Sequence, residues 1–271
     1  MKSNAAAGIR SKVATSNLRS NRLTVISAIL LAFIIGLILA APIFQHITSG
    51  DAFSVDLFNR YKGPSLAHPV GTDELGRDLL ARLLYGGRVS LFVGIITALL
   101  TALIGVTIGL SAGFYGGWID TLLMRTTDSV IALPLLPLLI VLAATDLTKL
   151  GLPDSLSDSP HATLYRIILI ISLVGWTTVA RLTRASVLAL REREFVLAAR
   201  SHGASSLKIM FGHILPNSLS PIIVATTLTV GNVILLESVL SFLGFGIQPP
   251  IPTWGNMLTN AQDMIFERPM A

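Results

Sequence analysis

The side chains able to do chemistry do not occur here in the patterns that catalysis or metal binding needs. None of the five lysines follows a glycine, so the sequence has no G-x4-G-K-[ST] loop to hold nucleotide phosphates. The five histidines show no H-E-x-x-H or other ligand spacing, and there is no cysteine to act as a nucleophile or metal ligand. No G-x-S-x-G nucleophile elbow occurs. We expect no catalytic site, no metal site and no cofactor bound by this chain.

The remaining chemical candidate is Glu237, a carboxylate between two apolar stretches. The uncharged residues 217–236 precede it and the apolar residues 238–247 follow it. Counting along a helix places Glu237 near an interface rather than at the bilayer centre. An ionisable residue in such a segment is a candidate functional site. Its side chain could hydrogen-bond within the bundle or could gate a pathway, and the sequence leaves both interpretations open.

The composition indicates that the elements carrying these residues lie in a bilayer. Hydrophobic residues make up 52% of the chain and charged residues only 13%, whereas a soluble domain has about 25% charged residues. The mean hydropathy is +0.72. A soluble globular enzyme and a disordered chain are therefore excluded. We expect the net charge of +5 to reflect membrane orientation rather than nucleic-acid binding.

Uncharged runs predict five membrane-spanning helices. Residues 23–44 are long enough to cross a hydrocarbon core of about 30 Å and exceed the apolar region of a signal peptide, so we expect a retained first span. The third run contains Pro134 and Pro137, which could kink a pathway-lining helix or serve simple packing. The fourth span begins near Thr163 and ends near Ala180. The other runs are 89–118, 129–145 and 217–236.

The second run carries small residues at every fourth position. They are Thr97, Thr101, Gly105, Gly109 and Gly113. Because residues four apart share one face of a helix, this face allows another backbone to approach closely. We expect the second span to lie inside the bundle, with the three glycines packed against a partner helix.

Basic residues indicate one orientation. Residues 1–22 contain five basic and no acidic side chains, which predicts a cytoplasmic N-terminus. The segments 45–88 and 146–163 show no basic excess and are expected outside. The segment 181–216 has six basic against two acidic residues and is expected inside. The protein should therefore be a multi-pass protein of the bacterial inner (plasma) membrane.

The predicted cytoplasmic loop has the most specific pattern. Residues 185–201 lack Gly and Pro and predict a helix, which Gly203 ends. Ser205 or Ser206 caps a second short helix, which runs through Phe211 and is closed by a proline before the fifth span. The small residues between the helices allow another protein to approach. Alternatively, the segment is an amphipathic helix whose arginines face lipid phosphates.

This loop resembles a known family motif. Leu197-Ala198-Ala199, then Gly203 and His213-Ile214-Leu215-Pro216, follow the spacing E-A-A-x3-G-x9-I-x-L-P, which is typical of permease subunits of binding-protein-dependent ABC importers. Leu197 replaces the glutamate of the pattern and His213 its isoleucine, and Glu194 is our candidate for the displaced acidic role. The resemblance implies docking on ATPase subunits through Glu194, Ala198, Ala199, Gly203, His213, Leu215 and Pro216.

Three further stretches narrow the family. The stretch 68–78, with 85–91, is similar to dipeptide, oligopeptide and nickel permeases, and so is 241–255. The resemblance, from about residue 23 to 257, is closest to the C-type subunit. It implies a type I ABC importer permease, with five spans visible. The sixth, expected after Trp254-Gly255, is missing, which implies a fragment or an inactive truncated product.

One external motif leaves two interpretations open. Its charges are balanced, so it could be an internally salt-bridged turn, or it could contact the substrate-binding protein or form an external gate. The residues concerned are Gly71, Thr72, Asp73, Gly76, Arg77 and Asp78.

The resemblance also implies an organisation and a set of partners. We expect a basic cytoplasmic tail at 1–22, a first transmembrane helix at 23–44, an external segment at 45–84 and an ABC transmembrane type-1 domain at 85–271, incomplete at its C-terminus, with a coupling loop at 185–216. The implied partners are a second homologous permease, two ATP-binding subunits, an extracytoplasmic solute-binding protein and membrane lipid, without nucleic acid.

The implied activity is ATP-driven transport by a subunit that is not itself an enzyme. Partner subunits hydrolyse ATP, and the substrate is by default a peptide. Nickel or another small solute is the alternative substrate. A secondary transporter independent of ATP and an intramembrane enzyme are the rival classes. Both rivals lack support, because the chain shows neither inverted repeats nor a catalytic pair within its spans.

Overall fold

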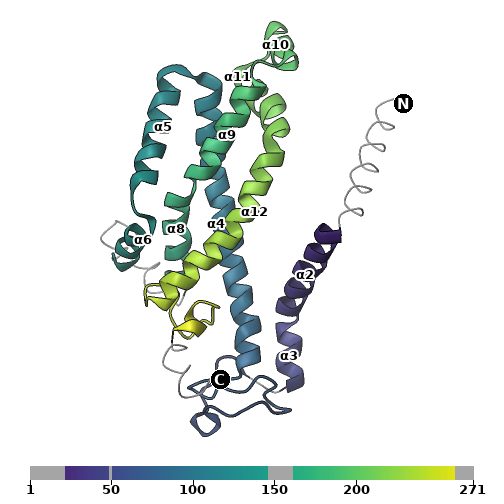
Figure 1. The fold of residues 1–271 in the computed structure, drawn as a ribbon, viewed down its shortest axis with the longest axis vertical. Helices are drawn as coiled ribbons and strands as arrows, with labels where there is room; N and C mark the ends of the chain where they lie inside the picture. The colour runs from purple at the N-terminus through teal and green to yellow at the C-terminus, as the bar shows by residue number, and fades with distance from the viewer. Residues whose placement is uncertain (1–21, 49–50, 146–160, 260–271) are drawn as a thin grey trace. The chain divides into compact units, whose positions relative to one another are not determined.

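The computed structural model describes residues 22–48, 51–145 and 161–259. Within these ranges the secondary structure is helical, and the one β-type pairing is an isolated bridge between Thr72 and Asp78 (Figure 1). The predicted all-α fold is therefore confirmed.

The chain divides into two compact units, residues 1–88 and 89–270. Three predicted features fall mainly outside the described residues. These are the basic tail at 1–22, the external loop at 146–163 and the region after residue 259, where the resemblance implies a sixth span.

The first unit has two helices where the sequence predicts one span at 23–44. The break comes at Ala40, two residues before Pro42, whose ring and missing N–H do not fit inside a regular helix. The predicted external segment at 45–84 is also shorter than expected, because helices enter it from both sides. The elements are α2 (Arg22–Leu39), α3 (Ala41–Thr48), η1 (Leu57–Asn59) and the first turns of α4 (Leu79–Tyr115).

The second unit is a helical bundle. Its elements after α4 are α5 (Gly117–Ala132), α6 (Leu135–Ala144), α8 (Ala162–Gly175), α9 (Thr177–Leu190), α10 (Glu194–Ser201), α11 (Ser206–Ile209), the π turn η3 (Met210–Ile214), α12 (Leu215–Phe242) and η4 (Asn256–Leu258).

Helix length and hydropathy support multiple membrane spans. Among the described residues, three helices are long and apolar enough to cross a membrane, Arg22–Leu39, Leu79–Tyr115 and Ser206–Phe242. The number rises to five if each of two bent pairs, α5 with α6 and α8 with α9, counts as one span. That upper figure agrees with the five predicted spans.

The third predicted span, 129–145, is wrong in its bounds, and its expected proline kink is a break between two helices. Helix α5 already begins at Gly117, and the chain bends by 85° between α5 and α6. Leu133 and Pro134 both have extended backbone angles at this bend. A residue before proline avoids the helical region, so Pro134 ends α5 rather than kinking one long helix.

The fourth span begins at Ala162, as predicted, but does not end near Ala180. After a bend of 41° at Trp176 it continues as α9 to Leu190. Arg181 and Arg184 therefore lie within a helix, where the prediction placed them in a loop. They do so because both are paired with carboxylates of α5.

Two apolar clusters hold the second unit together. The larger joins residues of α4, α6, α8 and α12 with Ile247. The smaller joins Leu110 of α4 and Val187 of α9 with residues of α10, α11 and η3. Many large apolar side chains on the outer faces of α4 and α12 are exposed, such as Leu103 and Leu235. Such surfaces suit a lipid environment, where exposed apolar side chains carry no free-energy penalty.

Candidate functional site

The glycine face of α4 packs against α9. A Cβ atom on Gly105 would lie 2.7 Å from the carbonyl oxygen of Trp176, and one on Gly109 would lie 2.4 Å from that of Ala180. A Cβ on Gly113 would lie 2.7 Å from the Cβ of Val187. Any side chain at these three positions would therefore force the two helices apart. The structure thus identifies α9 as the partner that the sequence could not name.

Ion pairs tie α9 to α5, and sequence reasoning missed them. Arg184 makes a bidentate pair with Asp120, with Nε···Oδ1 and Nη2···Oδ2 distances of 2.5 and 2.6 Å. Nη2 of Arg181 lies 2.5 Å from Oδ1 of Asp128. The signal that could have found them is charge complementarity between two segments predicted on the same side of the membrane. These pairs join the cytoplasmic ends predicted for the third and fourth spans.

The helix predicted at 185–201 is broken. Helix α9 ends at Leu190, three residues form a turn, and α10 begins at Glu194. Val187 and Val196 are both buried in the smaller apolar cluster. In one continuous helix, nine residues of about 100° each would put them on opposite faces. The turn at 191–193 therefore allows both side chains to reach the same core.

Gly203 ends α10, as predicted. Its φ of +76° is in the left-handed region, its N–H donates to the carbonyl of Arg200, and the N–H of Ala204 donates to that of Ala199. This pair of bonds is the Schellman arrangement that satisfies the last carbonyls of a helix. Nothing lies within 4 Å of a Cβ placed on Gly203. The backbone here is open to an approaching surface.

The next helix does not end at Phe211, and Pro216 does not separate it from the fifth span. Ser205 caps α11 by accepting a bond from the N–H of Lys208, and the helix runs without interruption to Phe242. A π turn precedes the proline, and the N–H of Leu215 donates five residues back to Met210. This local shift in hydrogen bonding accommodates a residue that lacks an N–H.

We use the name coupling segment for residues 185–216. Figure 1 shows α10 and α11 together at one end of the second unit. Of the seven residues assigned to ATPase docking, four are exposed and three half-buried. The structure therefore brings this set to one accessible end of the bundle. The exposed residues are Glu194, Ala198, Gly203 and Pro216, and the half-buried ones are Ala199, His213 and Leu215.

A cavity of about 1080 Å³ lies among α4, α5, α6, α8, α9 and α12. Its walls are mostly apolar and include Leu133 and Leu135, on either side of the Pro134 bend, and Gly175 beside the Trp176 bend. Both bends of the bundle thus border one cavity. This geometry supports the pathway-lining interpretation of the proline kink.

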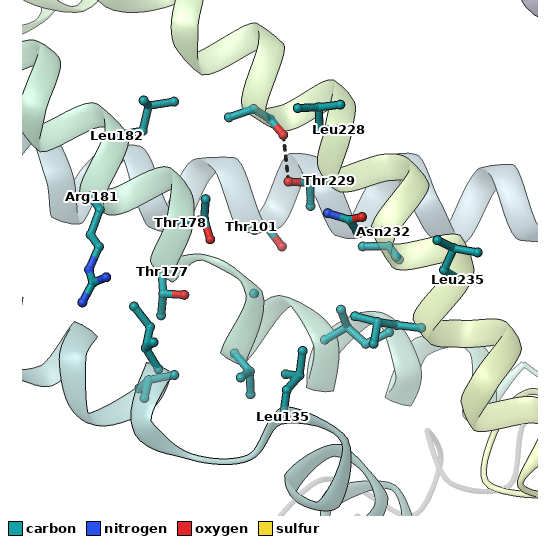
Figure 2. A pocket seen from close by; sticks show the side chains of 18 of the residues that line it. Thr101, Leu135, Thr177, Thr178, Arg181, Leu182, Leu228, Thr229, Asn232 and Leu235 are labelled. Carbon is teal, nitrogen blue, oxygen red and sulfur yellow. Dashed lines mark hydrogen bonds between the residues drawn. The ribbon is translucent and has the colours of Figure 1, made fainter.

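A few polar side chains interrupt the apolar wall (Figure 2). The buried hydroxyl of Thr101 has no hydrogen-bond partner among the described residues. The hydroxyl of Thr229 donates to the carbonyl of Ala225. The remaining polar residues of the wall are Thr177, Thr178, Arg181 and Asn232.

The external motif forms a buried network in the first unit. Asp73 Oδ1 accepts bonds from the N–H groups of Leu75 and Arg77, and its Oδ2 lies 2.7 Å from Arg77 Nε and 3.4 Å from Arg82 Nε. Asp78 Oδ1 accepts a bond of 2.7 Å from the N–H of Ala81 and so caps α4, while its Oδ2 lies 2.9 Å from His68 Nδ1.

Glycines and a hydroxyl complete this network. A Cβ on Gly76, at a φ of +76°, would lie 1.8 Å from the carbonyl oxygen of Asp56. Gly71 has a φ of +93°, and Thr72 Oγ1 donates to the carbonyl of Asn59. Arg77 is paired with Asp73 and Asp78 with His68, and the side chains of Asp73, Arg77 and Asp78 are buried rather than facing solvent. The geometry favours the salt-bridged turn over a direct contact with a soluble partner.

Glu237 is fully buried at the end of α12 away from the coupling segment. Its Oε1 accepts a bond of 2.7 Å from the hydroxyl of Ser241. It does not line the large cavity. Among the described residues, no three His, Asp or Glu side chains gather where they could hold a metal ion.

Comparison with known proteins identifies the family. Residues 105–270 match the family described as binding-protein-dependent transport system inner membrane component. The dipeptide transport system permease protein DppC of Alkalihalophilus pseudofirmus is 38% identical over 256 residues, which cover 94% of this chain and 79% of the relative. The oligopeptide transport system permease protein OppC of Bacillus subtilis is 37% identical over 92% of this chain and 76% of the relative.

A third relative is also named as a peptide permease. A putative peptide transport system permease protein of Brucella suis is 40% identical over 233 residues, covering 86% of this chain and 74% of the relative. The matched family residues include the glycine face of α4, both bent pairs and the coupling segment. This chain therefore belongs to the family of binding-protein-dependent transport system inner membrane components.

Proposed function

We propose that this chain is the permease subunit of an ABC importer that carries peptides across the inner membrane. The observation that carries the proposal is the match to proteins named as dipeptide and oligopeptide permeases over 94% and 92% of the chain. Neither nickel nor another small solute appears in those names. An importer independent of ATP is likewise not favoured by this kinship.

In this proposal, ATP is bound and hydrolysed by two partner subunits rather than by this chain. Their docking surface is the coupling segment, whose exposed small side chains and open glycine permit close approach. The positive charge of the segment supports its placement on the cytoplasmic side, together with the N-terminus. The opposite end of the second unit then faces outward, toward a solute-binding protein.

The packing of the coupling segment supports its role as a lever. Val196 of α10 and Ile214 of η3 share one buried cluster with Leu110 of α4 and Val187 of α9. A force on α10 is therefore passed to α4, α9 and the long helix together. Packed interfaces with two stable arrangements can turn such a small displacement into a change between inward- and outward-open states.

The cavity between α5, α9 and α12 supports a role as one wall of the translocation pathway. Its walls are mostly apolar, with a few hydroxyl and amide groups, which suits passage of peptides with varied side chains better than tight binding of one ion. A second, homologous permease would supply the opposite wall, and lipid would surround both.

The test is purification followed by transport. The tagged chain, expressed from its native locus and extracted in detergent, should co-purify with a second permease and two ATPases, identified by mass spectrometry. In proteoliposomes with the binding protein, the complex should accumulate labelled di- and oligopeptides only when ATP is supplied. The control is the same complex with an ATPase subunit altered in its phosphate-binding lysine.

Two results would contradict the proposal. Recovery of the chain without ATPase subunits would remove the ATP-driven mechanism. Uptake of nickel but not of peptide by the assembled complex would keep the mechanism and reject the substrate.

A further inference from the structure

The segment after α12 folds back onto the end of that helix. Gly244, at a φ of +83°, ends α12, with its N–H donating to Ser241 and the N–H of Phe245 donating to Leu240. This is again the Schellman arrangement. Asn256 then holds the segment together, because its side-chain amide donates to the carbonyls of Ile247 and Ile251. The name return segment is used below for residues 244–258.

The return segment packs against the turn of α12 that contains Glu237 and Ser241. A Cβ on Gly246 would lie 2.0 Å from Ser241 Oγ. A Cβ on Gly255 would lie 2.7 Å from Ser238 Cα, 2.8 Å from Ser241 Cβ and 3.1 Å from Glu237 Oε2. Two glycines of the segment therefore contact one turn of the helix at distances that no other residue permits.

The carboxyl group of Glu237 is placed between this turn and the segment. Its Oε1 accepts the bond from Ser241, whereas its buried Oε2 has no hydrogen-bond partner within the described ranges and faces Gly255. Buried polar atoms without a partner are rare in native proteins, because they lose hydration without replacement. A carboxyl group held at such a position indicates a role beyond filling space.

The other side of the return segment is attached to α4. The N–H of Trp254 donates to Ser90 Oγ at 3.2 Å, and Thr253 beside it is fully buried. The segment thus bridges α12 and α4 at the end of the second unit that is opposite the coupling segment.

One continuous helix joins this bridge to the coupling segment. The 37 residues Ser206–Phe242 extend for about 55 Å at 1.5 Å per residue, more than the hydrocarbon core of about 30 Å. Its first turns belong to the cluster that also contains Val196 of α10. Displacement of α10 is therefore carried along one continuous helix to Glu237.

We propose that Glu237 is a positioning residue that fixes the return segment to α12. Movement of α12 at the coupling segment then moves the return segment relative to Ser90 on α4, at the end of the second unit opposite the coupling segment. This inference rests on the proposed function, since it assigns a role within ATP-driven transport.

Distance between the return segment and α4 provides a test that does not depend on the substrate. Because the chain has no cysteine, Ser90→Cys with Trp254→Cys creates the only thiol pair within it. In the assembled complex, the rate of disulfide formation should change by at least about threefold when a non-hydrolysable ATP analogue is added. Glu237→Ala should abolish this nucleotide dependence, and Glu237→Gln should retain it, because the amide oxygen still accepts from Ser241.

Transport by the same variants, without the added cysteines, completes the test. Glu237→Ala should lower peptide uptake at least about tenfold while ATP hydrolysis continues, since a buried contact is lost without loss of docking. Glu237→Gln should remain within about threefold of the unaltered complex. The matched control is Val239→Ala, two residues away on an exposed face of α12, which should leave uptake and cross-linking unchanged.

Several outcomes would overturn the proposal. One is a nucleotide dependence of disulfide formation in Glu237→Ala that equals that of the unaltered complex. Another is a loss of this dependence, or of peptide uptake, in Glu237→Gln that is as large as in Glu237→Ala. If Glu237→Ala fails to assemble, Ser241→Ala is the deciding variant, because it removes only the hydroxyl that donates to Glu237. If disulfide formation in Ser241→Ala still depends on nucleotide as in the unaltered complex, the positioning role is rejected. Absence of peptide uptake by the unaltered complex would reject the proposed function, while the cross-linking comparison would still decide the role of Glu237.

Discussion

At the scale of single residues, glycine and charge decide where backbones meet. Gly109 lies where α4 touches the backbone of α9, and Arg77 lies where buried carboxylates need a partner. Neither residue acts on a substrate in the proposed mechanism. Gly109 permits the close packing of α4 on α9, and Arg77 neutralises a buried carboxylate. Substitutions at either residue should therefore lower the stability of the fold before they affect transport.

Gly109→Ala should destabilise the bundle by about 1–3 kcal/mol, the usual effect of overpacking. The added Cβ would lie 2.4 Å from the carbonyl oxygen of Ala180, which is backbone and cannot rotate away. The matched control is Gly231→Ala in α12, where nothing lies within 4 Å; it should be neutral or stabilising, because alanine favours helix. Thermal unfolding in detergent measures both, and equal effects would contradict the packing argument.

Arg77→Ala should greatly reduce the amount of folded protein in the membrane. Removing one partner of a buried pair costs about 3 kcal/mol or more. Asp73 would keep its two backbone hydrogen bonds, but its one remaining ion pair would be the longer contact to Arg82. Glu74→Ala is the control, since Glu74 is more exposed and lies 3.2 Å from Arg77. It should have a smaller effect. Normal expression of Arg77→Ala with lost uptake would instead support an external gate.

At the scale of elements, ion pairs and a short helix connect parts distant in the sequence. The pairs between α5 and α9 keep arginines inside a helix that sequence reasoning ended earlier. The α10–α11 unit joins the ends of α4, α9 and α12 through one apolar cluster.

The Arg184–Asp120 pair should contribute more to stability than the Arg181–Asp128 pair. The first is bidentate and the more buried; both side chains of the second are about half exposed, at 51% and 50%. A double-mutant cycle with Arg184→Gln and Asp120→Asn should give a coupling energy of about 1 kcal/mol, and the second pair should give less. Thermal unfolding measures the coupling energies. Equal coupling energies in the two cycles would contradict the predicted ranking of the two ion pairs.

Ala198→Asp should weaken association with the ATPase subunits. Ala198 is exposed on α10, so the substitution adds bulk and charge without entering the core. The control is Ala198→Ser, which adds one hydroxyl and no charge. Co-purification from detergent measures the effect, with permease yield as the reference. Undiminished recovery of the ATPase with the Asp variant would exclude this face of α10 from docking.

At the scale of the whole second unit, the bends of α5–α6 and α8–α9 border one cavity that local patterns do not reveal. Its lining residues come from six helices, and Leu228 of α12 and Thr178 of α9 both border it (Figure 2). Whether this space contains water distinguishes a pathway from a lipid-filled groove.

A cysteine in the cavity should react with a water-soluble, membrane-impermeant thiol reagent. Thr178→Cys places a thiol on the cavity wall, whereas Leu103→Cys places one on a face of α4 that is exposed but outside the cavity. The first should react at least about tenfold faster, because thiolate forms in water and not in lipid. The chain has no natural cysteine, so labelling of each variant is specific. Equal rates would contradict a hydrated pathway.

Much of the molecule follows from local sequence. Apolar composition determined the membrane class, and uncharged runs indicated the number of spans but not all of their bounds. Residues such as Gly203 and Ser205 marked helix ends, because helix caps depend on neighbouring residues alone. Spacing of four also identified the packing face of Gly105, Gly109 and Gly113. These properties need no knowledge of distant contacts.

Other features were decided only by tertiary structure. The partner of the glycine face, the turn at 191–193 and the persistence of a helix past Arg181 all depend on residues far away in the chain: α9, the shared cluster of Val187 and Val196, and Asp128. The contacts of Glu237 with Ser241 and Gly255 are of the same kind. A one-dimensional pattern reports periodicity and polarity, whereas pairing between segments depends on which surfaces fit when the whole chain packs.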